Sequence, residues 1–120
     1  MKDFTVYINE KLKITKDISR QNQCNYHPKT RDELKELIER LIEERGNDAN
    51  LNDIDVSKIT DMSSIFKFTN FNGDISDWDV SKVKNMEGMF SDTEFNGDIS
   101  DWDVGEVENM KWMFSDSKFN

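Results

Sequence analysis

A 24-residue unit occurs three times in succession between residues 48 and 119, and it limits the possible folds more than any other feature. Residues 72–95 and 96–119 are identical at 17 of 24 positions, which chance does not produce. Eight positions of each unit are apolar, so a single unit has one apolar side and nothing of its own to bury it against. Stacking identical units solves that problem, and the repeat therefore predicts a solenoid.

The apolar positions recur as columns, which we expect to form the core. These columns are Leu51/Ile75/Ile99, Ile54/Trp78/Trp102, Val56/Val80/Val104, Ile59/Val83/Val107, Met62/Met86/Met110, Ile65/Met89/Met113, Phe66/Phe90/Phe114 and Phe71/Phe95/Phe119. An aromatic ligand-binding box built from the Trp and Met columns is an alternative, but their spacing favours core.

The period of 24 falls within the 20–29 residues of leucine-rich repeats. Residues 78–83 are rich in β-formers and predict a strand. Met86, Met89 and Phe90 follow the spacing of a helical turn, and residues 96–98 supply a turn into the next unit. We therefore expect an α/β fold: a short leucine-rich-repeat-like solenoid of three 24-residue coils.

The segment before the repeat predicts a cap. Residues 30–45 carry a capping box at Thr30 and Glu33 and one apolar stripe, so we expect a helix that covers the first coil. Alternation within residues 4–14 predicts a hairpin. Residues 1–46 are thus expected to form a hairpin plus capping helix, and residues 47–120 the three-repeat solenoid, all in one compact domain.

The string ISDWDVSKVKNMEGMF (75–90), followed by FNGDIS (95–100), resembles the BspA-like leucine-rich-repeat surface proteins, also known as the DUF285 family. The resemblance covers residues 48–120, and residues 26–30 resemble the segment that often precedes such repeats. It implies a bacterial repeat protein that binds host or matrix proteins, without enzymatic activity or cofactor. The chain departs from the family in having no export signal and only three repeats.

Charge is distributed unevenly along the chain. Of the net charge of −9, residues 1–46 contribute +1 and residues 47–120 contribute −10. Such an acidic segment repels nucleic acid, but suits a basic protein partner or a protein that imitates nucleic acid. No apolar run reaches the roughly 20 residues that span a bilayer. Without a signal peptide we expect a cytoplasmic protein, or a cell-surface one if a leader or longer parent chain is missing.

Aspartates form two further columns, Asp53/Asp77/Asp101 and Asp55/Asp79/Asp103. Bound Ca²⁺ is one explanation of stacked carboxylates, but Asp side chains that bond their own backbone at turns are favoured. The column Asp61/Asn85/Asn109 is expected to be an amide ladder between coils. Carboxylates repeated identically are architectural rather than catalytic, so no catalytic or metal site is predicted.

His27 and the single cysteine, Cys24, lie three residues apart. A Cys–His metal pair or a thiol nucleophile would need further partners that the sequence does not supply. We interpret both as structural.

At columns that vary among the repeats, packing of the core does not determine the residue type. These columns predict the binding surface. Two of them lie on the expected strand and change sign along the array, and Trp112 stands where the other repeats have Ser64 and Gly88. The predicted partner-binding residues are Lys58, Thr60, Lys82, Lys84, Glu106, Glu108 and Trp112. Neutral variation is the alternative for the charged columns.

The last coil has no predicted cap, so we expect its apolar edge to be covered by a second copy in a homodimer, by a partner, by Trp112 folding over it, or by further chain beyond this sequence. Two functions remain open. One is a non-enzymatic protein–protein interaction module of the BspA-like type. The other is a small acidic intracellular inhibitor or decoy, of the kind carried by mobile elements, which occupies a basic or nucleic-acid-binding site on an enzyme.

Overall fold

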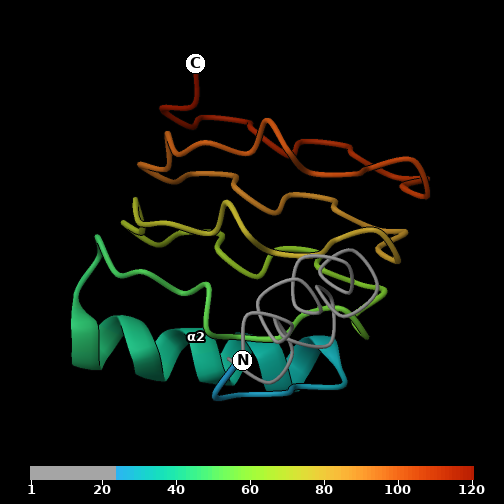
Figure 1. Cartoon of the computed structure of the whole chain (residues 1–120). Helices are drawn as coiled ribbons and strands as arrows, with labels where there is room; N and C mark the ends of the chain where they lie inside the picture. Colours follow the sequence, from blue (N-terminus) through green and yellow to red (C-terminus); the bar gives the residue numbers. More distant parts are fainter. Residues whose placement is uncertain (1–23) are drawn as a thin grey trace, which may run out of the picture.

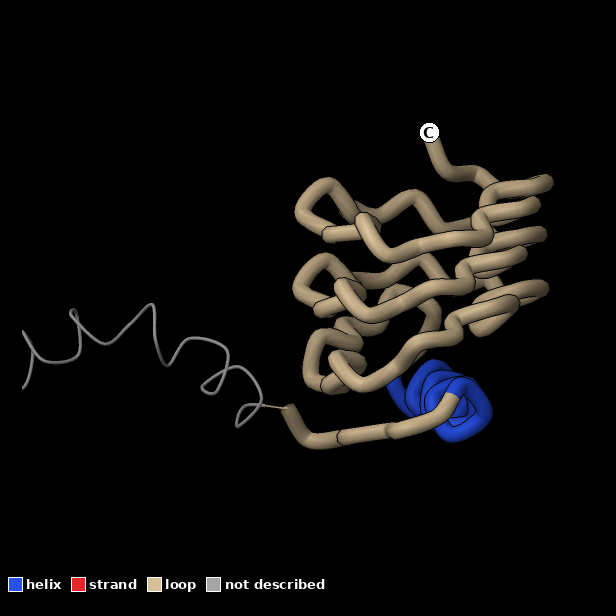
Figure 2. The backbone as a smooth tube through the Cα atoms, turned by 90° about the vertical axis from the view of Figure 1, so that its right-hand side faces the viewer, coloured by secondary structure: helices blue, strands red, loops and turns tan. Residues whose placement is uncertain are grey.

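The computed structural model describes residues 24–120. Within them there is one α-helix, α2 (Arg31–Arg45), which lies along the base of the molecule. The three repeats lie above it as successive layers of turns, with the C-terminus at the opposite end from α2 (Figures 1 and 2). The hairpin predicted within residues 4–14 lies outside the described residues.

The ends of α2 follow from its capping residues. The Thr30 hydroxyl accepts a hydrogen bond from the Glu33 N–H at 3.2 Å, and the Glu33 carboxylate accepts from the Lys29 N–H at 2.9 Å. The second bond of the predicted capping box therefore reaches one residue further back than expected. The helix ends where Gly46, in the left-handed region at φ 96°, donates its N–H to the Ile42 carbonyl.

The buried face of α2 consists of Leu34, Leu37, Ile38 and Leu41. All four belong to the same core as the repeats. The helix thus closes the side of the first repeat that faces the base of the molecule.

The predicted α/β leucine-rich-repeat-like solenoid is wrong. In residues 24–120 the repeats form no strand and no sheet, and their layers are joined by isolated parallel bridges such as Asp61 to Asn85 and Asn85 to Asn109. Residues 78–83, expected to be a strand, contain a turn at Ser81 and Lys82. The expected helical turn at residues 85–90 is also absent, because Gly88 in its middle has φ 62°.

Two features of the backbone explain why extended strands do not form. Each repeat places two residues in the left-handed region, at the columns Ser64/Gly88/Trp112 and Phe68/Asp92/Asp116, with φ between 54° and 64°. A left-handed residue turns the chain and interrupts a strand. Asp and Asn side chains also bond the backbone N–H two residues on, as Asp79 does with Ser81 and Asn85 does with Glu87.

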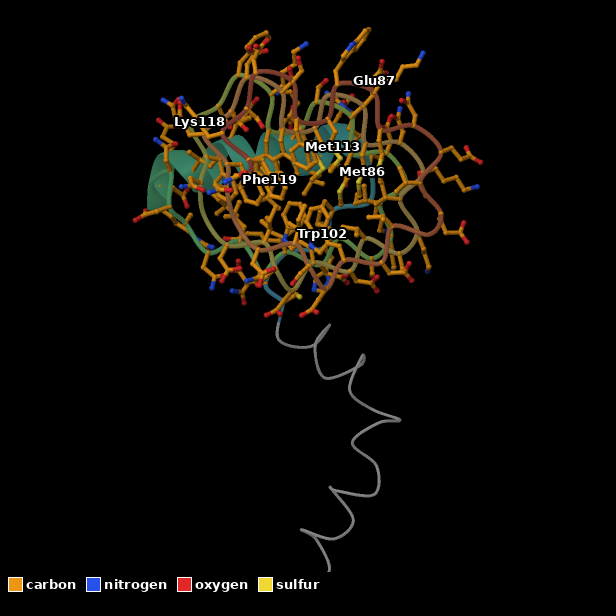
Figure 3. The ribbon with its side chains drawn as sticks, turned by 90° about the horizontal axis from the view of Figure 1, so that it is seen from above. Met86, Glu87, Trp102, Met113, Lys118 and Phe119 are labelled. Atoms are coloured by element: carbon orange, nitrogen blue, oxygen red, sulfur yellow. The ribbon has the colours of Figure 1, made fainter. Side chains whose placement is uncertain are left out.

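The core between the layers is a set of aromatic ladders. Ring centroids are 5.5 Å apart from Phe66 to Phe90 and 5.6 Å from Phe90 to Phe114. The Trp78 and Trp102 rings stack at 6.4 Å. Viewed along the stack, Trp102, Met86, Met113 and Phe119 lie inside the ring of backbone, whereas Glu87 and Lys118 lie at its rim (Figure 3).

Close contact between layers requires glycine at one position. A Cβ on Gly73 would lie 1.9 Å from the carbonyl oxygen of Ala49 in the repeat below. That carbonyl accepts the Asp74 N–H at 3.0 Å. Gly73 therefore allows the bond that sets the spacing of the first two repeats.

Candidate interaction surface

Six of the predicted partner-binding residues lie at one exposed turn of the stack, which we call the charged corner: Lys58, Thr60, Lys82, Lys84, Glu106 and Glu108. Its layers are bonded directly, because the Lys84 N–H donates to the Thr60 carbonyl and the Glu108 N–H to the Lys84 carbonyl, both at 2.8 Å. All six side chains are exposed, and none forms an ion pair within the described part of the chain. Since the strand is absent, the corner is a turn rather than a strand face.

The charged corner changes sign along the stack. The second repeat presents Lys82 and Lys84, whereas the third presents Glu106 and Glu108. A partner that lies along this corner therefore meets positive charge in one layer and negative charge in the next. Such an arrangement can fix the orientation of a charged partner.

Trp112, the seventh predicted residue, is 68% exposed. Its φ is 56°, and a bulky residue in the left-handed region costs about 1–2 kcal/mol. Its column holds Ser64 and Gly88 in the other repeats, so the fold does not require an indole there. Trp112 does not belong to the columns of the charged corner; it lies four residues after Glu108 in the sequence.

Phe68 was missed by the sequence argument. It is 75% exposed, has φ 64°, and lies with the Lys67 ammonium 5.0 Å from its ring centroid. The signal that could have found it is the column itself, in which the later repeats have Asp92 and Asp116. An aromatic residue aligned with two aspartates is not a core position.

In one of the two predicted columns the aspartates bond their own backbone at turns, as expected. Asp55, Asp79 and Asp103 accept from the N–H two residues on at 3.0–3.1 Å. The Asp74 carboxylate accepts hydrogen bonds from the Ser76 hydroxyl and the Ser76 N–H, and these bonds lower the pKa of Asp74. Ser100 lowers the pKa of Asp98 in the same way.

Asp53, in the first repeat, pairs with a cation. Arg45, at the end of α2, donates to both carboxylate oxygens at 3.0 Å. The bonds from Arg45, together with one from Asn25, lower the pKa of Asp53. The bonds to Asp53 also raise the pKa of Arg45. The pair ties the helix to the first repeat.

The column Asp61/Asn85/Asn109 does not form the expected ladder of side-chain amides between coils. Asp61 and Asn85 bond the N–H two residues on within their own repeats. A ladder does occur in another column: Asn72 accepts from the Asn96 N–H at 2.8 Å and Asn96 from the Asn120 N–H at 2.9 Å.

Cys24 and His27 belong to a short segment that lies beside the first repeat. Tyr26 forms a parallel bridge with Ile54. His27 Nδ1 lies 3.2 Å from a carboxylate oxygen of Asp55, and Cys24 Sγ is 4.0 Å from the Asn52 carbonyl. Burial raises the pKa of Asp55, but bonds from Ser57 and His27 outweigh it and the net pKa is lowered.

In residues 24–120 no three His, Cys, Asp or Glu side chains lie close enough to hold a metal ion. Nor is any helix of this part long and apolar enough to cross a membrane.

Two columns predicted as core are exposed in the third repeat. Met110 is 44% exposed and Val104 is 38% exposed, whereas Met86 and Val80 in the same columns are buried. Together with Trp112, they give the outer side of the third repeat an apolar character.

Comparison with known families gives one match. A family model described as "Mycoplasma protein of unknown function, DUF285" matches residues 33–120. No curated protein and no solved structure matches the chain. The predicted membership is therefore confirmed for α2 and all three repeats, and the BspA-like relationship stays a prediction.

Proposed function

This chain belongs to the DUF285 family, for which no activity is described, and we propose that it is a non-enzymatic protein–protein interaction module. The observation that carries the proposal is Trp112: a tryptophan that is 68% exposed and held in the left-handed region. Strain at a residue that the fold does not require is characteristic of functional positions. Tryptophan is also among the residues that contribute most to protein–protein binding.

The charged corner supports the same proposal. Its side chains are exposed and form no ion pairs within residues 24–120. The residue types vary from repeat to repeat, whereas the backbone that carries them repeats. Rim charges of this kind select and orient partners more than they add affinity. We therefore assign the energy of binding to Trp112 and the selection of the partner to the charged corner.

The test is capture of partners by the immobilised chain, with Trp112→Gly as the variant. Glycine already occupies this column at Gly88, so the variant keeps the backbone and removes only the indole. Ser64→Gly is the matched control, because it makes the same change in the first repeat. We expect Trp112→Gly to weaken capture at least about tenfold and Ser64→Gly to leave it unchanged. Equal capture by all three proteins would contradict the proposal.

A second candidate function is the acidic decoy that occupies a basic or nucleic-acid-binding site on an enzyme. The observation in its favour is charge: residues 47–120 hold sixteen Asp and Glu against six Lys. Salt dependence separates the two candidates. Affinity for a captured partner should fall steeply between about 0.05 M and 0.5 M salt for a charge mimic, and little for an apolar anchor at Trp112.

A further inference from the structure

The positive charges of the charged corner lie in the two layers nearest α2. Lys58 belongs to the first repeat, and Lys82 and Lys84 belong to the second. A fourth lysine, Lys29, lies just before α2, beside the same corner. All four side chains are exposed, and none forms an ion pair within residues 24–120. We call these four lysines the basic patch.

A shallow depression joins Lys29 to the charged corner. It has a volume of about 370 Å³ and is lined by Lys29, Thr30, Arg31, Asp32, Thr60 and Asp61. Thr60 also belongs to the charged corner, and its carbonyl accepts the Lys84 N–H at 2.8 Å. Figure 1 shows the start of α2 and the turns of the first two repeats one above another at the same end of the molecule. The basic patch is therefore one continuous surface across α2 and two repeats.

The carboxylates of the depression are engaged within the chain. Asp32 pairs with Arg31 at 2.9 Å, and Asp61 accepts the Ser63 N–H at 2.9 Å. Asp32 and Glu33 also lie in the first turn of α2, where they balance the positive end of the helix dipole. The lysine side chains, and not the helix terminus, therefore carry the uncompensated charge of this surface.

The exposure of the basic patch does not depend on the ends of the stack. Lys82 and Lys84 belong to the second repeat, which has a layer on either side, and both are nevertheless exposed. Val80 and Val83 of the same turn are buried. The turn thus directs its valines into the core and its lysines outwards.

The basic patch contrasts with the rest of the repeats, which are acidic. Residues 47–120 hold sixteen Asp and Glu against six Lys, and two of those six are Lys82 and Lys84. At physiological ionic strength, exposed charges more than about 8 Å apart are largely screened from one another. A group that approaches the corner therefore responds mainly to the lysines within its reach.

We propose that the basic patch binds an acidic segment of a partner protein, extended along the stack. This rests on the proposed interaction function and names the chemistry of the segment that the charged corner selects. Carboxylates complement four ammonium groups that have no counter-ion in the described part of the chain. Hydrogen-bonded layers are about 4.8 Å apart, so the patch extends about 10 Å from α2 to the second repeat. An extended chain covers that length with about three residues.

The third repeat limits the acidic segment. Glu106 and Glu108 stand in the columns of Lys82 and Lys84, so a longer acidic run would meet like charge there. The segment should therefore carry about three acidic residues towards α2 and a neutral or basic residue against the third repeat. This change of sign sets the direction of the segment along the stack.

The experiment uses the full chain and a fluorescently labelled peptide, blocked at both ends, with three consecutive glutamates between glycine and serine residues. Binding is measured by fluorescence anisotropy at about 0.15 M salt. We expect saturable binding of this peptide, and no binding of the same peptide with lysine in place of glutamate. Lys84→Glu should weaken binding at least about fivefold, because it replaces an attractive charge by a repulsive one.

Lys118→Glu is the matched control. It makes the same change of charge at an exposed residue at the opposite end of the layer (Figures 1 and 3). Screening should keep its effect below about twofold. Equal weakening by Lys84→Glu and Lys118→Glu, or no binding of the glutamate peptide, would overturn the proposal.

Two further measurements sharpen the test. The double variant Glu106→Lys, Glu108→Lys extends the basic patch by one layer and should bind a peptide of five consecutive glutamates at least about fivefold more tightly than the wild type does. Displacement of the peptide by an equal concentration of inorganic phosphate would overturn the proposal, because it would indicate a site for a small anion. Partner capture that still depends on the Trp112 indole would then leave the proposed function standing.

Discussion

The second and third repeats have nearly the same sequence and very different surroundings. Met86 is completely buried and Met110 is 44% exposed; Val80 is 1% exposed and Val104 is 38% exposed. The same residue types occupy the same columns, so neither composition nor local conformation causes the difference. What differs is the layer above, which the second repeat has and the third repeat lacks within the described residues.

The comparison extends to the two ends of the stack. At one end α2 buries four apolar side chains against the first repeat, and Arg31 donates to the carbonyl of Ser63. At the other end the side chains of Val104, Met110 and Trp112 are exposed, and the N–H of Met110 has no hydrogen-bond partner within residues 24–120. Cohesion of the molecule therefore decreases from α2 towards the C-terminus, and four predictions test this gradient.

The largest effect is expected for the Phe66/Phe90/Phe114 column. Phe90→Ala removes a ring stacked between two others and fully buried, and should cost about 3–5 kcal/mol of unfolding free energy. Phe114→Ala deletes the same group from the half-buried layer and should cost about half as much. Urea unfolding of both variants measures the ratio. Equal losses would show that the gradient is absent.

The next prediction concerns the covered end. Arg31→Met removes the cation from the Ser63 carbonyl and should cost about 1–2 kcal/mol, because a partly buried acceptor loses a charged donor. Lys35→Met is the matched control, since it breaks only an exposed pair with Glu39 worth about 0.3–0.5 kcal/mol. Thermal unfolding compares the two. A loss for Arg31→Met no larger than that of the control would mean that the bond does not stabilise the end.

Acid should loosen the contact of α2 with the first repeat. The pKa of Asp53 is lowered in the folded protein from an ordinary 3.8, chiefly by Arg45. A lowered folded pKa means that the stabilisation is complete above about pH 4 and is lost as pH falls through the folded pKa.

The measurement is urea unfolding at pH 7 and pH 3 for the wild type and Asp53→Asn. The variant should lose about 1 kcal/mol or less at pH 7, because the pair is partly exposed, and should show a smaller further loss at pH 3. The same loss in both proteins between the two pH values would contradict the assignment.

The smallest effects, of opposite sign, are expected in the left-handed column. Gly88→Ala adds a Cβ at φ 62° and 3.2 Å from the Ser64 hydroxyl, and should destabilise by about 1 kcal/mol. Trp112→Gly relieves strain in the third repeat and should stabilise by less than about 1 kcal/mol, because glycine also gains freedom in the unfolded chain. Differential scanning calorimetry of both proteins checks the signs. Destabilisation by Trp112→Gly would show that the indole contributes packing.

Prediction from the sequence succeeded where a residue's column decides its environment. The spacing placed Phe66 and Phe90 in the core and Trp112 outside it, and both placements are confirmed. The predictions of a strand at residues 78–83 and a helical turn at residues 85–90 were wrong. β-Propensity and i, i+3, i+4 spacing favoured them, but Asp79 and Gly88 turn the chain there. Gly88 in the middle of the expected helical turn was the overlooked signal.

The exposure of the candidate surface was predicted only in part. Variation among repeats led to the charged corner and Trp112, whose role in binding stays a prediction. The direction of each peptide N–H was not predictable, because side-chain spacing does not reveal it. Phe68 was predictable from its column and was missed. The partner of Asp55 was also hidden, because His27 is 28 residues away in the chain.

The sequence by itself determined the family, the number of repeats and the capped helix, because these depend on spacing and on local capping residues. Only the tertiary structure decided which apolar columns are buried and which amides are paired. Burial and hydrogen bonding of one repeat depend on the repeat that lies against it. Met86 and Met110 are alike in sequence, and only the layer above one of them makes it core.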